Sequence, residues 1–181
     1  MAAPSLRTVA WALAALAAAG ALAALALHGE RPEAGLARFQ AAGVMVDRDT
    51  SRASAIEVLR DGRRWRYQRG PSGWAAAPGS PAGPRQPGPT AELGLRLLHG
   101  SIPQRVMAAE EVRAMSLAEV GLLPPALVVR VEFPGEPSFA LELGSRNPQG
   151  QARYARRAGS AEVLLLNAFV ADPFQALTEE R

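Results

Sequence analysis

Five arginines flank an Asp-Gly pair in one short stretch of the chain, and they are the side chains best suited to binding chemistry. They are Arg60, Arg63, Arg64, Arg66 and Arg69. A guanidinium binds planar anions through two hydrogen bonds, so the cluster is a candidate contact for a lipid phosphate, an acidic polysaccharide or an acidic partner protein. Trp65 and Tyr67 alternate with Arg66, which predicts that the rings lie on the other face of a strand, in the core. The alternative, which we expect, is an arginine-rich face exposed to solvent.

Glu92, Arg96 and His99 form a second candidate, because their spacing places them on one face of a helix. In a functional interpretation, His99 acts as a base that Glu92 holds in position. The alternative is a solvated helix face with an ion pair between Glu92 and Arg96. We expect the solvated face.

Acidic residues in the same region are a third candidate. Asp47 and Asp49, together with Glu57 or Asp61, have the chemistry to hold a cation or to act as paired carboxylates. The Asp-x-Asp-x-Asp-Gly spacing of a calcium loop is missing, and arginines flank the pair. We therefore expect a polar loop.

Composition argues against most catalytic classes. Cysteine and lysine are absent, which removes thiol nucleophiles, thiolate metal sites, Schiff-base chemistry and the P-loop lysine. The chain has two histidines, His28 and His99, and it lacks the Gly-x-Ser-x-Gly and Gly-x-Gly-x-x-Gly patterns. We expect no enzyme activity, no metal and no cofactor. The 17 acidic residues nearly balance the 20 basic ones, so the net charge of +3 does not indicate nucleic-acid binding, and we expect no nucleic-acid partner.

The uncharged run from Thr8 to Leu27 is long enough to cross a membrane, because a helix of this length spans about 30 Å. Small residues near its end also fit a cleaved signal peptide, so residues 1–27 are a membrane anchor or a signal peptide. The positive charges before the run favour a cytoplasmic N-terminus and a periplasmic C-terminal domain, in a single-pass protein of the bacterial inner membrane. Residues 28–53 are expected to form a stalk, with a short helix from Pro32 to Gln40.

Residues 54–181 are predicted to form one α+β domain. Alternating runs at 54–59 and 64–69 flank Asp61-Gly62, a strong hairpin signal, and a third strand begins at Trp74. The Pro/Gly-rich segment 78–89 cannot hold regular structure, and is either a mobile loop or a connection wrapped on the domain. A helix follows from Thr90 as N-cap to His99-Gly100. Its predicted inward face consists of Ala91, Gly94, Leu95 and Leu98.

The C-terminal half repeats the pattern. We expect a strand at 102–107, a short helix that begins at Glu110 and Glu111, and a capping box at 116–119. Alternation then predicts strands at 127–133, 139–143, 153–157 and 162–166, and a final helix within 168–177 that packs Phe169, Phe174 and Leu177. The fold class is therefore α+β, with an N-terminal transmembrane helix followed by two antiparallel β-meanders and short helices.

An ordered set of motifs between Ser54 and Leu166 resembles the DUF4340 family of membrane-anchored bacterial proteins. The set comprises the charged hairpin, the element from Trp74 to Pro78, the leucine-rich helix, the segment Ser116 to Leu127, and Leu141 to Gly144 leading to Ala152 to Arg156. The chain departs from the family at Val120, where an aromatic is usual, and in its Pro-Gly tract. Members have no defined reaction, and some are encoded with gliding-motility-type ABC transporter components.

The resemblance implies an accessory role in the envelope. We expect a membrane-anchored periplasmic adaptor that contacts the cytoplasmic membrane through residues 8–27 and binds another envelope protein, with a component of an ABC transporter system as the candidate partner. The alternative is a module that binds an anionic lipid or polysaccharide through the arginine-rich hairpin. The sequence leaves the partner and the oligomeric state open.

Overall fold

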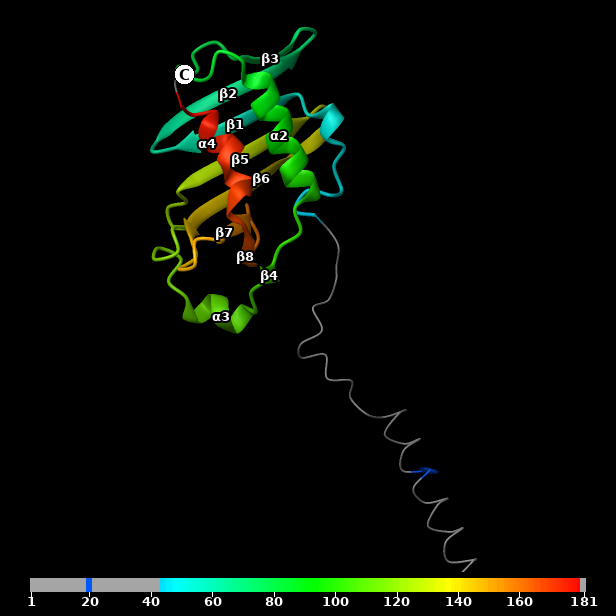
Figure 1. Cartoon of the computed structure of the whole chain (residues 1–181), viewed down its shortest axis with the longest axis vertical. Coiled ribbons are helices and arrows are strands. Elements are labelled where there is room, and N and C mark those ends of the chain that lie inside the picture. Colours follow the sequence, from blue (N-terminus) through cyan, green and yellow to red (C-terminus); the bar gives the residue numbers. More distant parts are fainter. Residues whose placement is uncertain (1–18, 21–42, 180–181) are drawn as a thin grey trace, which may run out of the picture. The chain divides into compact units, whose positions relative to one another are not determined.

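The computed structural model describes residues 19–20 and 43–179 (Figure 1). Residues 43–179 form an α+β domain with an eight-stranded antiparallel sheet and three short helices, which confirms the α+β part of the predicted fold class. The expected anchor at 8–27, apart from Ala19 and Gly20, and the expected helix at 32–40 lie outside the described residues. Within the described residues, no helix is both long enough and apolar enough to cross a membrane.

The sheet joins the two predicted meanders edge to edge. Its strands are β1 (Ala55–Arg60), β2 (Arg63–Gly70), β3 (Gly73–Ala76), β4 (Arg105–Val106), β5 (Leu127–Phe133), β6 (Glu136–Arg146), β7 (Ala152–Arg157) and β8 (Leu164–Asn167). The order is β3-β2-β1-β5-β6-β7-β8-β4, and every pair is antiparallel. Pairing of β1 with β5 therefore turns two local meanders into one continuous sheet.

The first hairpin has the turn that its sequence predicts. Asp61 and Gly62 both have positive φ, at 51° and 72°, and Arg60 pairs directly with Arg63. Two consecutive residues with positive φ match the right-handed twist of the flanking strands, and Gly adopts this conformation without a steric penalty.

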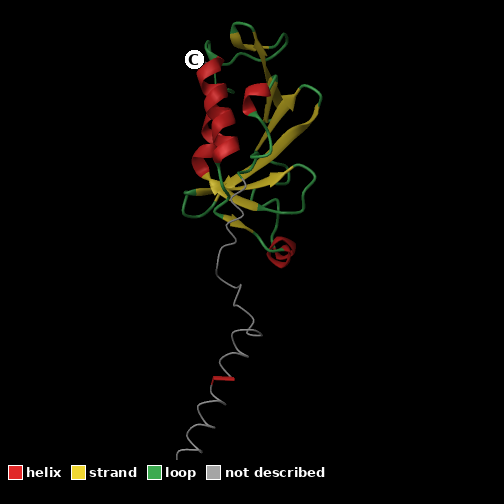
Figure 2. Cartoon of the chain, turned by 90° about the vertical axis from the view of Figure 1, so that its right-hand side faces the viewer, coloured by secondary structure: helices red, strands yellow, loops and turns green. Residues whose placement is uncertain are grey.

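Helices α2 (Pro87–Gly100) and α4 (Asp172–Ala176) cover one face of the sheet, which we call the helix-bearing face (Figure 2). Gly94 of α2 allows the helices to approach closely, because a Cβ there would lie 2.7 Å from the Phe174 ring. Phe174 and Leu95 are fully buried, and each contributes about 1.5–3 kcal/mol of hydrophobic burial. The predicted inward face of α2 is confirmed.

We call the other side of the sheet the open face, because no helix of residues 43–179 lies over it (Figure 2). Strand alternation assigns the side chains: Leu127, Val129 and Val131 of β5 are buried on the helix-bearing face, whereas Arg130 between them is exposed on the open face. Charged residues on the open face are thus separated from the core by the thickness of one sheet.

Helix α2 begins three residues before the predicted N-cap, Thr90. Pro87 occupies the first turn, where its missing N–H would have had no helical partner. The preceding Pro/Gly-rich loop is a wrapped connection, because the Trp65 indole donates to the Ala82 carbonyl at 3.1 Å and the Ser80 hydroxyl accepts from the Arg66 N–H at 2.7 Å.

The domain starts earlier than residue 54, where we expected the stalk to end. Val44 and Met45 are buried, and their backbone N–H groups donate to Ser101 and Leu98 at 2.9 and 3.2 Å. A 3₁₀ helix, η1 (Thr50–Arg52), follows and leads into β1. Residues 43–53 therefore belong to the folded domain.

Helix α3 (Ala109–Ala114) carries Glu110 and Glu111 in its first turn, as predicted. The strand expected at 102–107 has two residues, β4. At the C-terminus, a 3₁₀ turn, η2 (Ala168–Ala171), precedes α4. The predicted packing of Phe169 was wrong, because this side chain is 51 % exposed while Phe174 and Leu177 are buried.

Candidate functional site

The five arginines of the first hairpin lie on both faces of the sheet. The open face carries Arg64 and Arg66, and the helix-bearing face carries Arg60, Arg63 and Arg69. This division follows from the two-residue periodicity of the strands. Trp65 and Tyr67 are buried in the core, as their alternation predicted. The five arginines, which are close together in the sequence, therefore form two separate groups in the fold.

Arg66 is held on the open face by two carboxylates. Its terminal nitrogens donate to Glu132 at 2.6 and 2.7 Å, a bidentate pair that reaches across β1 to β5. Glu57 on β1 is 6 % exposed and lies 3.8 Å from Arg66 and 3.7 Å from Arg64. The hydrogen bonds from Arg66 lower the pKa of Glu132, and the same bonds raise the pKa of Arg66. An anion that approached Arg66 would have to displace Glu132.

A second ion pair extends the open face towards the other end of the sheet. Arg156 of β7 lies directly opposite Glu142 of β6, donates from Nε to Oε2 of that carboxylate at 2.7 Å, and places Nη2 2.6 Å from the same oxygen. Charges of both signs are thereby fixed in position from β2 to β7. Arrays of this kind suit recognition of a complementary polar surface.

Arg69 is fixed on the helix-bearing face by Glu92 of α2. Its guanidinium donates to Glu92 at 2.6 Å and stacks over the Trp74 ring at 4.8 Å, while the Trp74 indole donates to the same carboxylate at 2.8 Å. These contacts attach the end of β2 and the edge strand β3 to the helix. Arg63, by contrast, stacks on the Trp65 ring at 5.3 Å.

The Glu92, Arg96 and His99 series does not act as a unit. Glu92 pairs with Arg69, so the expected ion pair with Arg96 is wrong. His99 is half-buried, and its Nδ1 atom is buried without a hydrogen-bond partner. Glu92 thus neither orients His99 nor activates it as a base.

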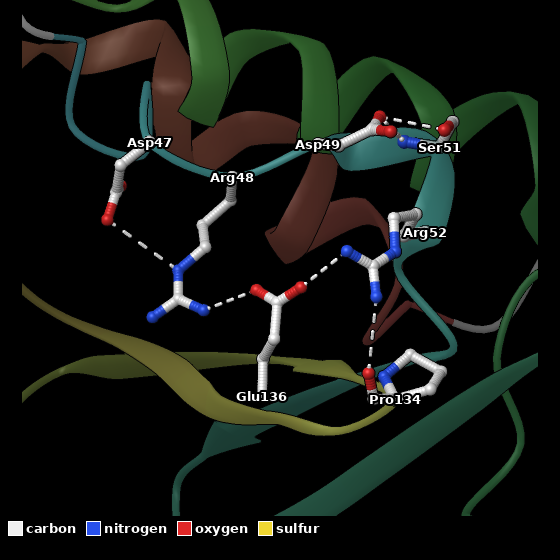
Figure 3. Close-up of polar contacts among 7 residues, drawn as sticks. All are labelled: Asp47, Arg48, Asp49, Ser51, Arg52, Pro134 and Glu136. Carbon is white, nitrogen blue, oxygen red and sulfur yellow. Dashed lines mark hydrogen bonds and ion pairs between the residues drawn. The ribbon is translucent and has the colours of Figure 1, made fainter.

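The acidic candidates are separated by the fold (Figure 3). Asp49 caps η1 by accepting from the Ser51 backbone at 2.9 Å and from its hydroxyl at 2.7 Å, which lowers the pKa of Asp49. Asp47 lies 3.7 Å from Arg48, whereas Asp61 is in the β1–β2 turn and Glu57 is on the open face. In the described part of the chain, no group of three potential ligands could hold a metal ion.

A latch that the sequence did not suggest joins residues 43–53 to the β5–β6 turn (Figure 3). Arg48 and Arg52 each donate to one oxygen of Glu136 at 2.7 Å. Arg48 also stacks over the Phe133 ring at 5.7 Å. One carboxylate therefore holds two arginines of the segment that leads into β1.

Arg153 of β7 is the most unusual charged residue that the sequence reading missed. Its side chain lies on the helix-bearing face, where the residue is 7 % exposed, and Nη1 donates to the Gly144 carbonyl at 2.7 Å. Its Nε atom is buried without a partner. The sequence predicts a strand at Arg153 but not the burial of its side chain, because no local pattern distinguishes a buried arginine from an exposed one.

Across residues 43–179, the recurrent polar arrangement is a guanidinium held by a carboxylate, and Nδ1 of His99, the only described histidine, has no hydrogen-bond partner. This chemistry supports surface recognition better than bond making. No family model, curated protein or solved structure matches the chain.

Proposed function

We propose that this chain is an accessory protein of the bacterial envelope, held at the cytoplasmic membrane by residues 8–27, whose α+β domain binds another envelope protein. The observation that carries the proposal is the open face, a broad sheet surface that no helix of residues 43–179 covers and whose charges are fixed in both signs. The DUF4340-like motifs favour a component of an ABC transporter system as the partner.

Charge pairing on the open face favours a protein partner over an anionic lipid or polysaccharide. Glu132 binds Arg66 through two hydrogen bonds, and Glu57 lies beside Arg64. A polyanion would have to compete with these carboxylates. A protein surface can instead match both signs of charge at once, which gives specificity.

Tethering to the bilayer supports the same role. An adaptor confined near the membrane meets a membrane partner at a high effective concentration, so a moderate affinity is sufficient. The latch between Glu136 and the arginines of residues 43–53 attaches the start of the domain firmly to the sheet.

Site-specific photocrosslinking in intact cells tests the proposal. A photoreactive amino acid would replace Arg130 or Gln68, which are exposed on the open face, and in matched controls Arg96 or Leu93, which are exposed on α2. We expect the open-face positions to yield one product of defined mass that contains the same envelope protein, and the α2 positions to yield none.

Two results would contradict the proposal. The first is that the open-face positions yield no product in cells that contain the folded protein, and the second is that the α2 positions crosslink the same partner equally well. A membrane fractionation of the same cells checks the anchor separately, because release of the full-length chain by salt would argue against an inserted segment at 8–27.

A further inference from the structure

A buried arginine on the helix-bearing face has a donor nitrogen without a partner. Arg153 carries five N–H donors, and its side chain donates from Nη1 to the Gly144 carbonyl. Nε is enclosed and has no acceptor. A buried cation normally has an anionic partner, because removing it from water is costly.

Two further arginines surround this position. Arg146 of β6 is the direct register partner of Arg153, and its Nη2 lies 3.6 Å from Asp172 at the start of α4. Arg60, at the end of β1, donates to Thr178 just after α4 at 3.0 Å. Three strands thus contribute three arginines, and Arg146 and Arg60 both act electrostatically on Arg153.

The charges of this group are out of balance. Arg60, Arg146 and Arg153 contribute three positive charges, whereas Asp172 and Asp61, which lies 3.5 Å from Arg60, contribute two negative charges. Burial lowers the pKa of Arg153. The positive charges of Arg146 and Arg60 lower this pKa further, whereas the negative charge of Asp172 raises it. Arg146 and Asp172 are both about half exposed, so the group borders on solvent.

We propose that Arg60, Arg146 and Arg153 form a binding site for one oxyanion group, a carboxylate or a phosphate. The guanidinium edge that includes Nε of Arg153 has two parallel donors, and two oxygens of an oxyanion match this spacing. Arg146 and Arg60 supply the flanking charge. The site lies on the helix-bearing face, so it is independent of partner binding through the open face.

Thermal unfolding of the full chain in a neutral detergent tests the site. Sodium phosphate and sodium acetate are compared with sodium chloride at equal ionic strength, which cancels general screening. An anion that binds the folded state raises its Tm, and the rise grows with the ratio of the anion concentration to its dissociation constant. We expect phosphate, acetate or both to raise Tm above the chloride value, and the more effective anion identifies the phosphate or the carboxylate source.

Matched variants locate the effect. In Arg153→Gln, the apparent affinity should fall by about tenfold or more, the usual weight of a charge-assisted hydrogen bond. Arg157→Gln, on the same strand but exposed, removes the same charge and should keep the affinity of the natural chain. No rise of Tm in either anion, or an unchanged affinity in Arg153→Gln, would overturn the proposal.

Asp172→Asn provides a test that does not depend on the folding of the Arg153 variant. Asp172 is exposed at the start of α4, and its carboxylate competes with an added anion for Arg146. Its removal should tighten phosphate or acetate binding by about threefold or more. If Arg153→Gln does not fold and Asp172→Asn leaves the affinity unchanged, the site assigned here is wrong.

Discussion

Arg66 on the open face and Arg153 on the helix-bearing face have different kinds of hydrogen-bond partner. Arg66 is partly exposed and has a bidentate carboxylate partner in Glu132, with a second carboxylate in Glu57 nearby. Arg153 is more deeply buried, and the partner of its side chain is a backbone carbonyl. The more accessible guanidinium is thus the better neutralised of the two.

The difference between these two arginines shows that neighbours in the sequence and neighbours in the fold are different sets of residues. The arginines that are neighbours in the sequence, at positions 60–69, are divided between the faces and engaged separately. Arg60, Arg146 and Arg153 come from three strands and meet because β1, β5, β6 and β7 are consecutive in the sheet. A run of like residues in a strand is therefore weaker evidence for a site than convergence of strand ends.

The largest expected effect concerns α4, whose first residue, Asp172, pairs with Arg146. Phe174→Ala removes a fully buried ring that packs on Gly94, and should lower the free energy of unfolding by about 3–5 kcal/mol. Urea unfolding measures the change, and Phe169→Ala is the control because this ring is 51 % exposed. Equal losses in the two variants would show that α4 is not anchored as described.

The next effect concerns Tyr67, whose hydroxyl donates to the Leu177 carbonyl just after α4. Burial raises the pKa of Tyr67 from 10.0 to about 12, so the neutral phenol stabilises the fold. Its contribution is complete below pH 10.0 and is lost as pH rises through about 12, by about 2–3 kcal/mol in total.

Ultraviolet absorbance of tyrosinate, followed together with urea unfolding, checks this alkaline loss. Tyr67→Phe should remove the tyrosine-dependent part of the loss and cost about 1 kcal/mol at neutral pH through the missing hydrogen bond. Tyr154→Phe leaves Tyr67 in place and should preserve the alkaline loss. A normal titration of Tyr67 would contradict its burial against α4.

A smaller effect is expected for the open-face pair. A double-mutant cycle with Arg66→Met and Glu132→Gln should give a coupling free energy of about 1 kcal/mol, since both side chains are about one third exposed. The exposed pair Arg113 and Glu110 is the matched control and should give about 0.3 kcal/mol. If the two pairs gave similar coupling free energies, the pair of Arg66 with Glu132 would be no more firmly held than the exposed pair of Arg113 with Glu110.

The same pair predicts the response to acid. The pKa of folded Glu132 is below its ordinary value of 4.5, so its stabilising contribution is present above pH 4.5 and is lost as pH falls through the folded pKa. Glu132→Gln should be less sensitive to pH in this range. Urea unfolding at successive acidic pH values measures this difference. If Glu132→Gln and the natural chain lose the same stability, the prediction is contradicted.

The smallest effect distinguishes Glu92 from Arg96 on α2. Glu92→Gln weakens the contacts to Arg69 and Trp74 and should cost about 1 kcal/mol in urea unfolding. Arg96→Gln should change stability by less than about 0.5 kcal/mol, because Arg96 is exposed. If the order were reversed, Arg96 would have a structural role that the contacts do not explain.

Local patterns predicted the elements of the fold. Asp61-Gly62 specified its hairpin, alternation located β5 and β6, and the apolar spacing of α2 identified the buried face. Each signal lies within a few residues of the structure that it determines. Element boundaries were less accurate, as at Pro87, because a proline is as suitable for the first turn of a helix as for a loop.

The charged contacts could not be predicted in the same way. Arg66 and Glu132 are 66 positions apart, and Arg48 and Glu136 are 88 apart, so their pairing depends on the association of β1 with β5 and of residues 43–53 with the β5–β6 turn. The hydrogen bond from Arg153 to the Gly144 carbonyl likewise depends on the pairing of β6 with β7. The sequence contains these residues but no local feature that pairs them.

The most direct measurement follows the arginine side chains themselves. The full chain, labelled with ¹⁵N-arginine in a neutral detergent, would be titrated with sodium phosphate and then sodium acetate, against a sodium chloride control, while the Nε–Hε signals are recorded. We predict that the Arg153 signal shifts in a saturable manner with at least one anion, while the Arg66 signal stays in place because Glu132 holds that guanidinium. Saturable movement of Arg66 with no change at Arg153 would contradict the comparison between the two faces.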